Sequence, residues 1–92
     1  MAADDSAATS FGIAFGPVLK AMRTQRHLTQ AELAKRAGLA RFYISDVELG
    51  RSRPSVATLV KFAHAFCMSL PDLLNTLAGA IERHGHRRHR SR

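Results

Sequence analysis

The chain contains a single cysteine, Cys67, and no long apolar run among its 92 residues. One cysteine cannot form an internal disulfide, which suits a reducing cytosol. No apolar stretch approaches the roughly 18 residues that a membrane-spanning helix requires. The start, Met-Ala-Ala-Asp-Asp-Ser, is acidic and lacks the basic and apolar regions of a signal peptide. We therefore expect a cytoplasmic protein that has no membrane partner.

The residue patterns that support catalysis or metal binding are also missing from the sequence. It contains no glycine-rich phosphate loop, no ordered cluster of metal ligands and no spaced pair of carboxylates. His84, His86 and His89 follow no spacing of an ordered metal site. Cys67 has no neighbouring base that would activate it, so we expect a small buried side chain at a helix end. We therefore expect that the protein is not an enzyme and that it has no catalytic residue, bound metal or cofactor.

Acidic residues are scarce relative to basic ones. The chain has 7 Asp and Glu residues against 14 Lys and Arg residues, which gives a formal net charge of +7. Residues 82–92 hold five arginines and one glutamate, so +4 of this charge lies in that short segment. A basic protein of this kind favours a polyanionic partner, most often nucleic acid. We expect residues 82–92 to form a disordered basic tail that adds non-specific phosphate contacts.

Apolar residues make up 46% of the sequence, which is enough for one small hydrophobic core. Residues 1–10 are small and polar and are predicted to form a flexible N-terminal arm. Phe11, Ile13 and Phe15 then alternate with small residues, a pattern that could give a short strand. Residues 11–81 are predicted to form the single folded domain.

Local signals mark five short helices within this domain. Gly16-Pro17 fits a helix start, because proline is accommodated in the first turn. Thr29-Gln-Ala-Glu32 is a capping box, and Gly38 is suited to end the helix that follows it. With no convincing strand, the sequence predicts a compact all-α fold. The helices are expected at residues 17–26, 29–37 and 40–49, after Ser55, and from Ser69.

The second and third of these helices show a joint spacing pattern that starts at Gln30. Ala34 lies where two steeply crossing helices approach and need a small side chain. Gly38 lies in the turn, where a left-handed backbone carries no steric cost for glycine. Ile44 and Val47 are spaced to bury branched side chains against the preceding helix. The combination indicates a helix-turn-helix motif far more specifically than any single residue.

Residues 15–74 resemble the DNA-binding domain of the phage repressor and Cro type, also called the XRE family. The segment is FGPVLKAMRTQRHLTQAELAKRAGLARFYISDVELGRSRPSVATLVKFAHAFCMSLPDLL, about two thirds of the chain. Within the family, FG before the first helix and GLARFYIS at the third look most like restriction–modification controller proteins. The resemblance implies a five-helix, lambda-repressor-like fold. It also implies a bacterial or phage-encoded transcriptional regulator that binds a roughly palindromic operator in double-stranded DNA as a homodimer.

Helical steps of about 100° place Arg41, Phe42, Ser45, Asp46 and Leu49 on one outward face of the third helix. The resemblance implies that this face lies in the major groove. Arg41 could then bind guanine, Phe42 could contact a thymine methyl, and Asp46 could accept from cytosine. Ser45 could contact a phosphate or a base edge. Alternatively, Arg41 is a solvated charge, Phe42 is a core or dimer residue, and Asp46 pairs with an arginine.

The resemblance also assigns residues that do not contact bases. Gln30 lies in the first turn of the second helix, where this family contacts phosphate. Arg51 and Arg53 lie in the connector after the third helix and are suited to backbone contacts. Arg23 and Glu48 match a structural salt bridge between the first helix and the end of the third, which we interpret as positioning the third helix.

Two residues depart from the family pattern. Ala40 stands where the third helix is usually capped by serine or threonine, so a side-chain cap is expected to be missing. Leu49 stands where a polar or basic residue is usual, which removes a phosphate contact or adds an apolar patch.

The fifth helix carries a broad apolar stripe, and the resemblance implies that part of it forms the homodimer contact. The alternative is that the whole stripe packs internally. A second hypothesis for the protein is an antitoxin-type interaction module that also binds DNA, and the possible protein partners are a toxin or RNA polymerase. The stripe consists of Leu70, Leu73, Leu74, Leu77 and Ile81.

Overall fold

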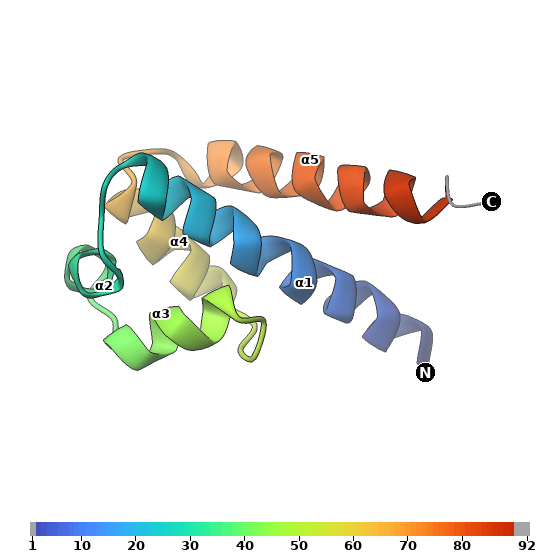
Figure 1. Ribbon diagram of the computed structural model, residues 1–92, viewed down its shortest axis with the longest axis horizontal. Helices are drawn as coiled ribbons and strands as arrows, with labels where there is room; N and C mark the ends of the chain where they lie inside the picture. The colour runs from blue at the N-terminus through green and yellow to red at the C-terminus, as the bar shows by residue number, and fades with distance from the viewer. Residues whose placement is uncertain (1, 90–92) are drawn as a thin grey trace.

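The computed structural model describes the backbone of residues 2–89 and the side chains of residues 14–80, 82 and 83. Five helices and no strand occur in this part of the chain, so the predicted all-α fold is confirmed. The short helices α2 to α4 lie together at one end, and the long helices α1 and α5 extend from them toward the two termini (Figure 1). The helices are α1 Ala2–Gln25, α2 Gln30–Ala37, α3 Arg41–Glu48, α4 Val56–Ala65 and α5 Leu70–His89.

Helix α1 begins much earlier than the sequence signals indicate. The expected start at Pro17 was wrong, because Pro17 lies inside a helix that begins at Ala2. Helical backbone also covers residues 2–10, where an N-terminal arm is expected, and it replaces the strand suggested at residues 11–15. Four alanines before residue 9 favour a helix there. Pro17 lacks the N–H that would donate within the helix, and its side chain is exposed.

Helix α5 likewise extends further than expected, because it continues to His89 through most of the tail predicted at residues 82–92. Residues 90–92 lie outside the described residues, as do the side chains of His84, His86 and His89. The boundaries predicted for the folded domain, residues 11–81, therefore stay a prediction.

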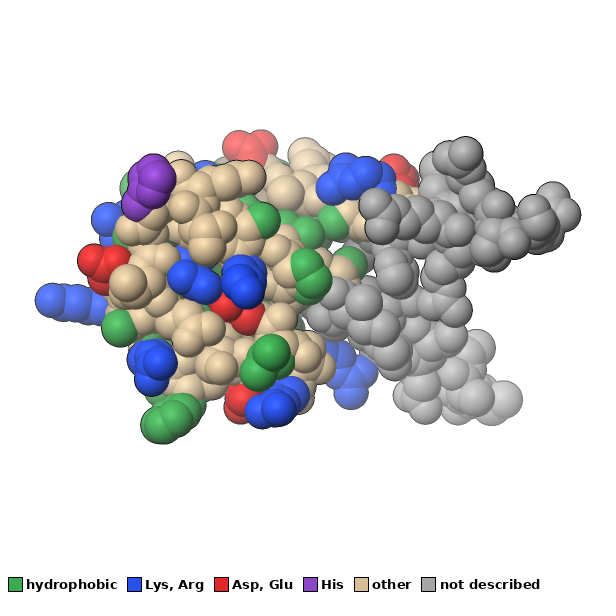
Figure 2. All heavy atoms as spheres, in the orientation of Figure 1, with side chains coloured by type: hydrophobic (Ala, Val, Ile, Leu, Met, Phe, Trp, Pro, Cys, Tyr) green, Lys and Arg blue, Asp and Glu red, His purple; other side chains and the backbone are tan. Residues whose placement is uncertain are grey.

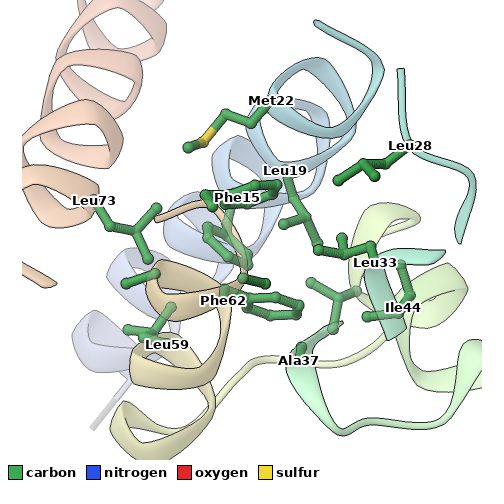
Figure 3. Close-up of a cluster of buried hydrophobic side chains, with 14 of the residues drawn as sticks. Phe15, Leu19, Met22, Leu28, Leu33, Ala37, Ile44, Leu59, Phe62 and Leu73 are labelled. Atoms are coloured by element: carbon green, nitrogen blue, oxygen red, sulfur yellow. The ribbon is translucent and has the colours of Figure 1, made fainter. Parts of the chain in front are cut away.

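The hydrophobic core takes side chains from every helix (Figure 3). Phe15 of α1 and Phe62 of α4 pack with their ring centroids 5.8 Å apart and their planes tilted by 47°. Burying one such large apolar side chain contributes about 1.5–3 kcal/mol relative to leaving it in water. The core packs α3 against α1 and α2 against α4. The largest fully buried side chains are Phe15, Leu19, Leu33, Ile44, Val47, Phe62, Leu73 and Leu77.

The predicted capping signals form the hydrogen bonds expected of them. The backbone N–H of Glu32 donates to the Thr29 hydroxyl at 3.0 Å, and the Glu32 carboxylate accepts from the Thr29 backbone N–H at 2.8 Å. Ser55 and Ser69 each accept a bond from the backbone three residues on, at 3.1 Å. Gly38 ends α2 with a left-handed φ of 70°. These bonds satisfy N–H groups that have no partner within the helix.

Two further helix ends use left-handed residues that the sequence does not mark. His27 after α1 and Cys67 after α4 both have a φ of 57°, although neither is glycine. The next residue closes each end, since Leu28 N–H donates to the Arg23 carbonyl and Met68 N–H to the Ala63 carbonyl. The expectation that Cys67 is buried was wrong, because its side chain is exposed. A residue in this cap position points away from the helix it ends.

The capping box predicts a specific pH dependence of stability. The backbone hydrogen bond from Thr29 lowers the pKa of the Glu32 carboxyl below its ordinary value of 4.5. The unfolded chain therefore binds this proton more tightly than the folded protein does. The stabilisation is complete above the unfolded pKa and is lost as the pH falls through the lower folded pKa. Urea unfolding of Glu32→Gln should show a shallower loss of stability between about pH 6 and about pH 3 than the parent. If the free energy of unfolding depends on pH equally in Glu32→Gln and the parent, this role for Glu32 is contradicted.

Candidate nucleic-acid interface

Helices α2 and α3 meet in the arrangement that the spacing pattern predicts. Ala34, Ile44 and Val47 are all buried. The turn between them is closed by Leu39 N–H, which donates to the Ala34 carbonyl at 2.9 Å. The left-handed Gly38 lets the chain leave α2 and enter α3 without strain. This geometry is a helix-turn-helix, and it leaves one side of α3 free of the core.

The outer face of α3 consists of Arg41, Phe42, Ser45, Asp46 and Leu49. Phe42 is 80% exposed and Leu49 is 62% exposed, while Arg41 is exposed and Ser45 and Asp46 are half-buried. Phe42 is therefore not a core residue. Among the described residues, the Asp46 carboxylate forms no ion pair. Along the lower edge of Figure 2, where Figure 1 places α3, basic, acidic and hydrophobic side chains lie side by side.

The connector after α3 is folded back onto the end of that helix. Gly50 adopts a left-handed φ of 79°, and Arg51 N–H donates to the Asp46 carbonyl at 2.8 Å. Ser52 N–H donates to the same carbonyl at 3.4 Å. Arg51 and Arg53 are both exposed. The backbone of Arg51 is thereby held against the end of α3, and Arg53 follows two residues later in the same connector.

A buried ion pair fixes the opposite side of α3. Arg23 of α1 donates to Glu48 through Nε at 2.7 Å and through Nη2 at 3.1 Å, so the contact is bidentate. The third nitrogen, Nη1, donates to the Leu28 carbonyl at 2.8 Å. The two side chains are 11% and 4% exposed. Helix α1, the α1–α2 loop and the last turn of α3 are thus joined through one guanidinium group.

Gln30 lies at this ion pair, which the sequence does not indicate. Its amide Nε2 donates to Glu48 Oε1 at 3.0 Å, and the side chain is half-buried. The phosphate contact expected of Gln30 stays a prediction. Gln30 begins α2 and Glu48 ends α3, but spacing along the sequence shows neither that these two helix ends meet nor how the amide is oriented.

Gly16 is a further residue whose structural role sequence reasoning missed. A Cβ atom at Gly16 would lie 2.5 Å from the Glu48 carbonyl oxygen and 2.9 Å from that of Val47. Only glycine therefore allows the backbone of α1 to approach the C-terminal carbonyls of α3 this closely. The Phe-Gly pair at residues 15–16 was the available signal.

The N-terminus of α3 lacks a side-chain cap, as Ala40 predicts. Other chemical groups do not gather into a site in the described part of the chain. No set of His, Cys, Asp and Glu side chains there is arranged to hold a metal ion. None of the helices between residues 2 and 89 combines the length and apolar character that crossing a bilayer requires.

A helix-turn-helix family model, HTH_3, matches residues 19–73, which contain α2, α3, α4 and the connector. The chain belongs to this helix-turn-helix family. The resemblance to phage repressors is thereby confirmed. The family is one of transcriptional regulators, and its matched segment includes the whole outer face of α3.

Relatives of this helix-turn-helix protein include two from Bacillus phage phi105. The ImmF control region 10 kDa protein is 38% identical over 77 residues, covering 84% of this chain and 86% of the relative. The immunity repressor protein is 46% identical over 50 residues, which cover 54% of this chain and 35% of the repressor. The similarity to the smaller phage protein therefore extends beyond the helix-turn-helix segment.

Solved structures of similar helix-turn-helix proteins share the fold. The clp gene regulator ClgR from Corynebacterium glutamicum matches with a TM-score of 0.76 and 28% identity, covering 86% of this chain and 84% of that one. The restriction-modification controller protein C.AhdI from Aeromonas hydrophila matches with a TM-score of 0.62 and 31% identity, covering 74% of this chain and 97% of that one.

The close approach at Gly16 makes a testable prediction about the helix-turn-helix fold. Gly16→Ala should lower the free energy of unfolding by about 1–3 kcal/mol, because the added methyl forces α1 away from the end of α3. Gly79→Ala in α5 is the matched control, since its Cβ would meet only a flexible arginine nitrogen at 3.4 Å. That change should stabilise the helix by about 0.5–1 kcal/mol. Urea denaturation measures the free energy of unfolding of both variants. A change of the same sign in the two variants would contradict the close contact at Gly16.

The buried ion pair makes a second prediction. Glu48→Ala should lower the free energy of unfolding by about 3 kcal/mol or more, because Arg23 would remain buried without its carboxylate. Glu82→Ala removes an exposed carboxylate from α5 and should change stability by less than about 0.5 kcal/mol. Thermal unfolding followed by circular dichroism compares the two variants. A Glu48→Ala protein with the same melting temperature as the parent would show that the ion pair does not stabilise the fold.

Proposed function

We propose that this protein is a sequence-specific transcriptional regulator that places the outer face of α3 in the major groove of double-stranded DNA. The observation that carries the proposal is the 80% exposure of Phe42 beside the exposed Arg41 at the start of α3. Leu49, on the same face of α3, is 62% exposed, and apolar surface that several neighbouring residues expose together marks an interaction site more than a single exposed residue does. Membership of a family of transcriptional regulators supports the same conclusion.

Four of the five residues of the outer face have a chemical match on the DNA. Arg41 presents two parallel N–H donors, which suit the O6 and N7 acceptors of guanine. Phe42 suits the methyl group of thymine, and Asp46 can accept from the N4 amino group of cytosine. The absence of an ion pair at Asp46 among the described residues favours base contact over internal pairing. Ser45 lies between them and can donate to a base edge or a phosphate.

The basic residues around this face are suited to the phosphate backbone. Arg51 and Arg53 are exposed on a connector that is hydrogen-bonded to the end of α3. Gln30, in the first turn of α2, lies near the positive end of that helix dipole. Contacts of this kind set register and affinity but carry no sequence information. We therefore assign specificity to Arg41, Phe42 and Asp46, and general attraction to Arg51, Arg53 and the C-terminal segment.

The regulator is proposed to bind as a homodimer through α5. Leu73 and Leu77 are buried in the domain, whereas Leu74 on the adjoining face is 42% exposed. A two-fold dimer would place two copies of α3 about 34 Å apart and recognise a roughly palindromic operator. The side chain of Ile81, which continues this face in the sequence, lies outside the described residues.

The names of similar proteins support a regulatory role. An immunity repressor, a clp gene regulator and a restriction-modification controller protein all resemble this chain. Regulation is proposed to follow from occupation of the operator, either by excluding polymerase or by contacting it.

Selection of bound duplexes from a random pool tests the proposed function. The parent should enrich a two-fold symmetric motif at moderate salt. Arg41→Ala, Phe42→Ala and Asp46→Asn should each change the preferred bases at symmetric positions, at a cost of about 1–3 kcal/mol per lost contact. Lys61→Ala, which removes an exposed charge from α4, is the control and should leave the motif unchanged.

Two results would contradict the proposal. A pool that shows no enrichment would leave only non-specific binding or a protein partner. A motif that stays the same when all three outer-face residues are replaced would show that α3 does not lie in the groove.

A further inference from the structure

Gln30 contacts the carboxylate that fixes the end of α3. It is the first residue of α2, and its amide Nε2 lies 3.0 Å from Glu48 Oε1. Glu48 also accepts two bonds from Arg23, and its side chain is only 4% exposed. A buried carboxylate with three N–H donors has little freedom to move. The amide of Gln30 is therefore held in one orientation, with its nitrogen directed at the last turn of α3.

The amide nitrogen of Gln30 has a donor left over. A primary amide carries two hydrogens on nitrogen, and the bond to Glu48 uses one of them. Gln30 is half-buried and follows the exposed Thr29, so the side chain lies at the edge of the protein surface. The first turn of a helix also attracts negative charge. A phosphate at this end of α2 can accept the second hydrogen while Glu48 keeps the first.

We propose that Gln30 is a positioning residue that couples a phosphate contact at the start of α2 to the orientation of α3 through Glu48. The inference rests on the proposed function, because it assigns part of the sequence discrimination of the DNA site to a residue that contacts no base. One amide nitrogen can donate to Glu48 and to a phosphate together only when the DNA backbone lies at one position relative to α3. Gln30 thus links the position of the DNA backbone to the position of the outer face.

Specific and non-specific binding depend differently on this link. Base contacts by Arg41 and Phe42 require α3 at a defined angle, because hydrogen bonds weaken steeply when they are misaligned. Non-specific binding depends on the number of neutralised phosphates and tolerates small rotations of α3. Loss of the Gln30 amide should therefore reduce affinity for the operator more than affinity for unrelated DNA. An ordinary phosphate contact would reduce both affinities alike.

The test compares Gln30→Met with Gln25→Met in the full chain. Methionine keeps the length and shape of glutamine and removes the amide, and Gln25 is exposed at the end of α1. Dissociation constants are measured for the selected operator and for an unrelated duplex of equal length, over a range of salt concentrations. For Gln30→Met, the dissociation constant for unrelated DNA divided by that for the operator should fall about tenfold. For Gln25→Met, this ratio should equal that of the parent. Circular dichroism at the binding temperature establishes that each variant is folded.

A second measurement separates positioning from a change in folding alone. Repeating the selection with Gln30→Met should give a motif with weaker preference at the bases assigned to α3. Equal losses of affinity for the operator and for the unrelated duplex would overturn the proposal in favour of a plain phosphate contact. In that case the slope of log affinity against log salt concentration would be smaller in magnitude by about one. Unchanged affinities for both duplexes would also overturn it. If the parent selects no motif at all, the proposed function itself fails, whereas a parental motif with an unchanged ratio for Gln30→Met refutes only the coupling.

Discussion

The bidentate contact between Arg23 and Glu48 determines how α3 is held against the rest of the protein. It joins α1 to the last turn of α3, and the same guanidinium reaches the Leu28 carbonyl in the loop before α2. Because both charges are nearly buried, either one alone would leave an unpaired ion in the interior. Among the described residues, every buried side-chain polar atom has a hydrogen-bond partner. The orientation of α3 is therefore set by directional bonds as well as by apolar packing.

The two sides of α3 consequently carry different constraints. Ile44, Val47 and Glu48 are fixed by the core, by the ion pair and by the close approach of Gly16, so a change there alters the fold. The outer face has no such support, and Phe42 contacts mostly solvent at 80% exposure. A helix held firmly on one side can present varied side chains on the other without loss of structure. This separation allows a helix-turn-helix protein to change the bases it prefers while its fold stays the same.

The sequence predicted the parts of the structure that depend on local chemistry. The capping box at Thr29, the turn at Gly38 and the burial of Ile44 and Val47 follow from residue type and spacing, and all are present. The start of α1 was missed because Pro17 usually marks the first turn of a helix, whereas here it is accommodated inside one. The exposed Cys67 was missed because its left-handed cap position is not marked by a glycine. The contact of Gln30 with Glu48 was missed because it depends on how α2 and α3 pack, which spacing along the chain does not give.

An ionic contact holds α3 where an apolar one of similar size could have been more stable. Burying two charges costs desolvation energy that their attraction often only offsets, so stability alone does not explain the pair. The directionality of the contact explains the pair, because a bidentate guanidinium–carboxylate contact fixes both distance and angle. Contacts between apolar side chains do not fix an angle in this way. Glu48 adds a further property, since it also accepts from Gln30 at the surface. An apolar residue at position 48 could fill the same volume, but it could not transmit the state of a surface amide to α3.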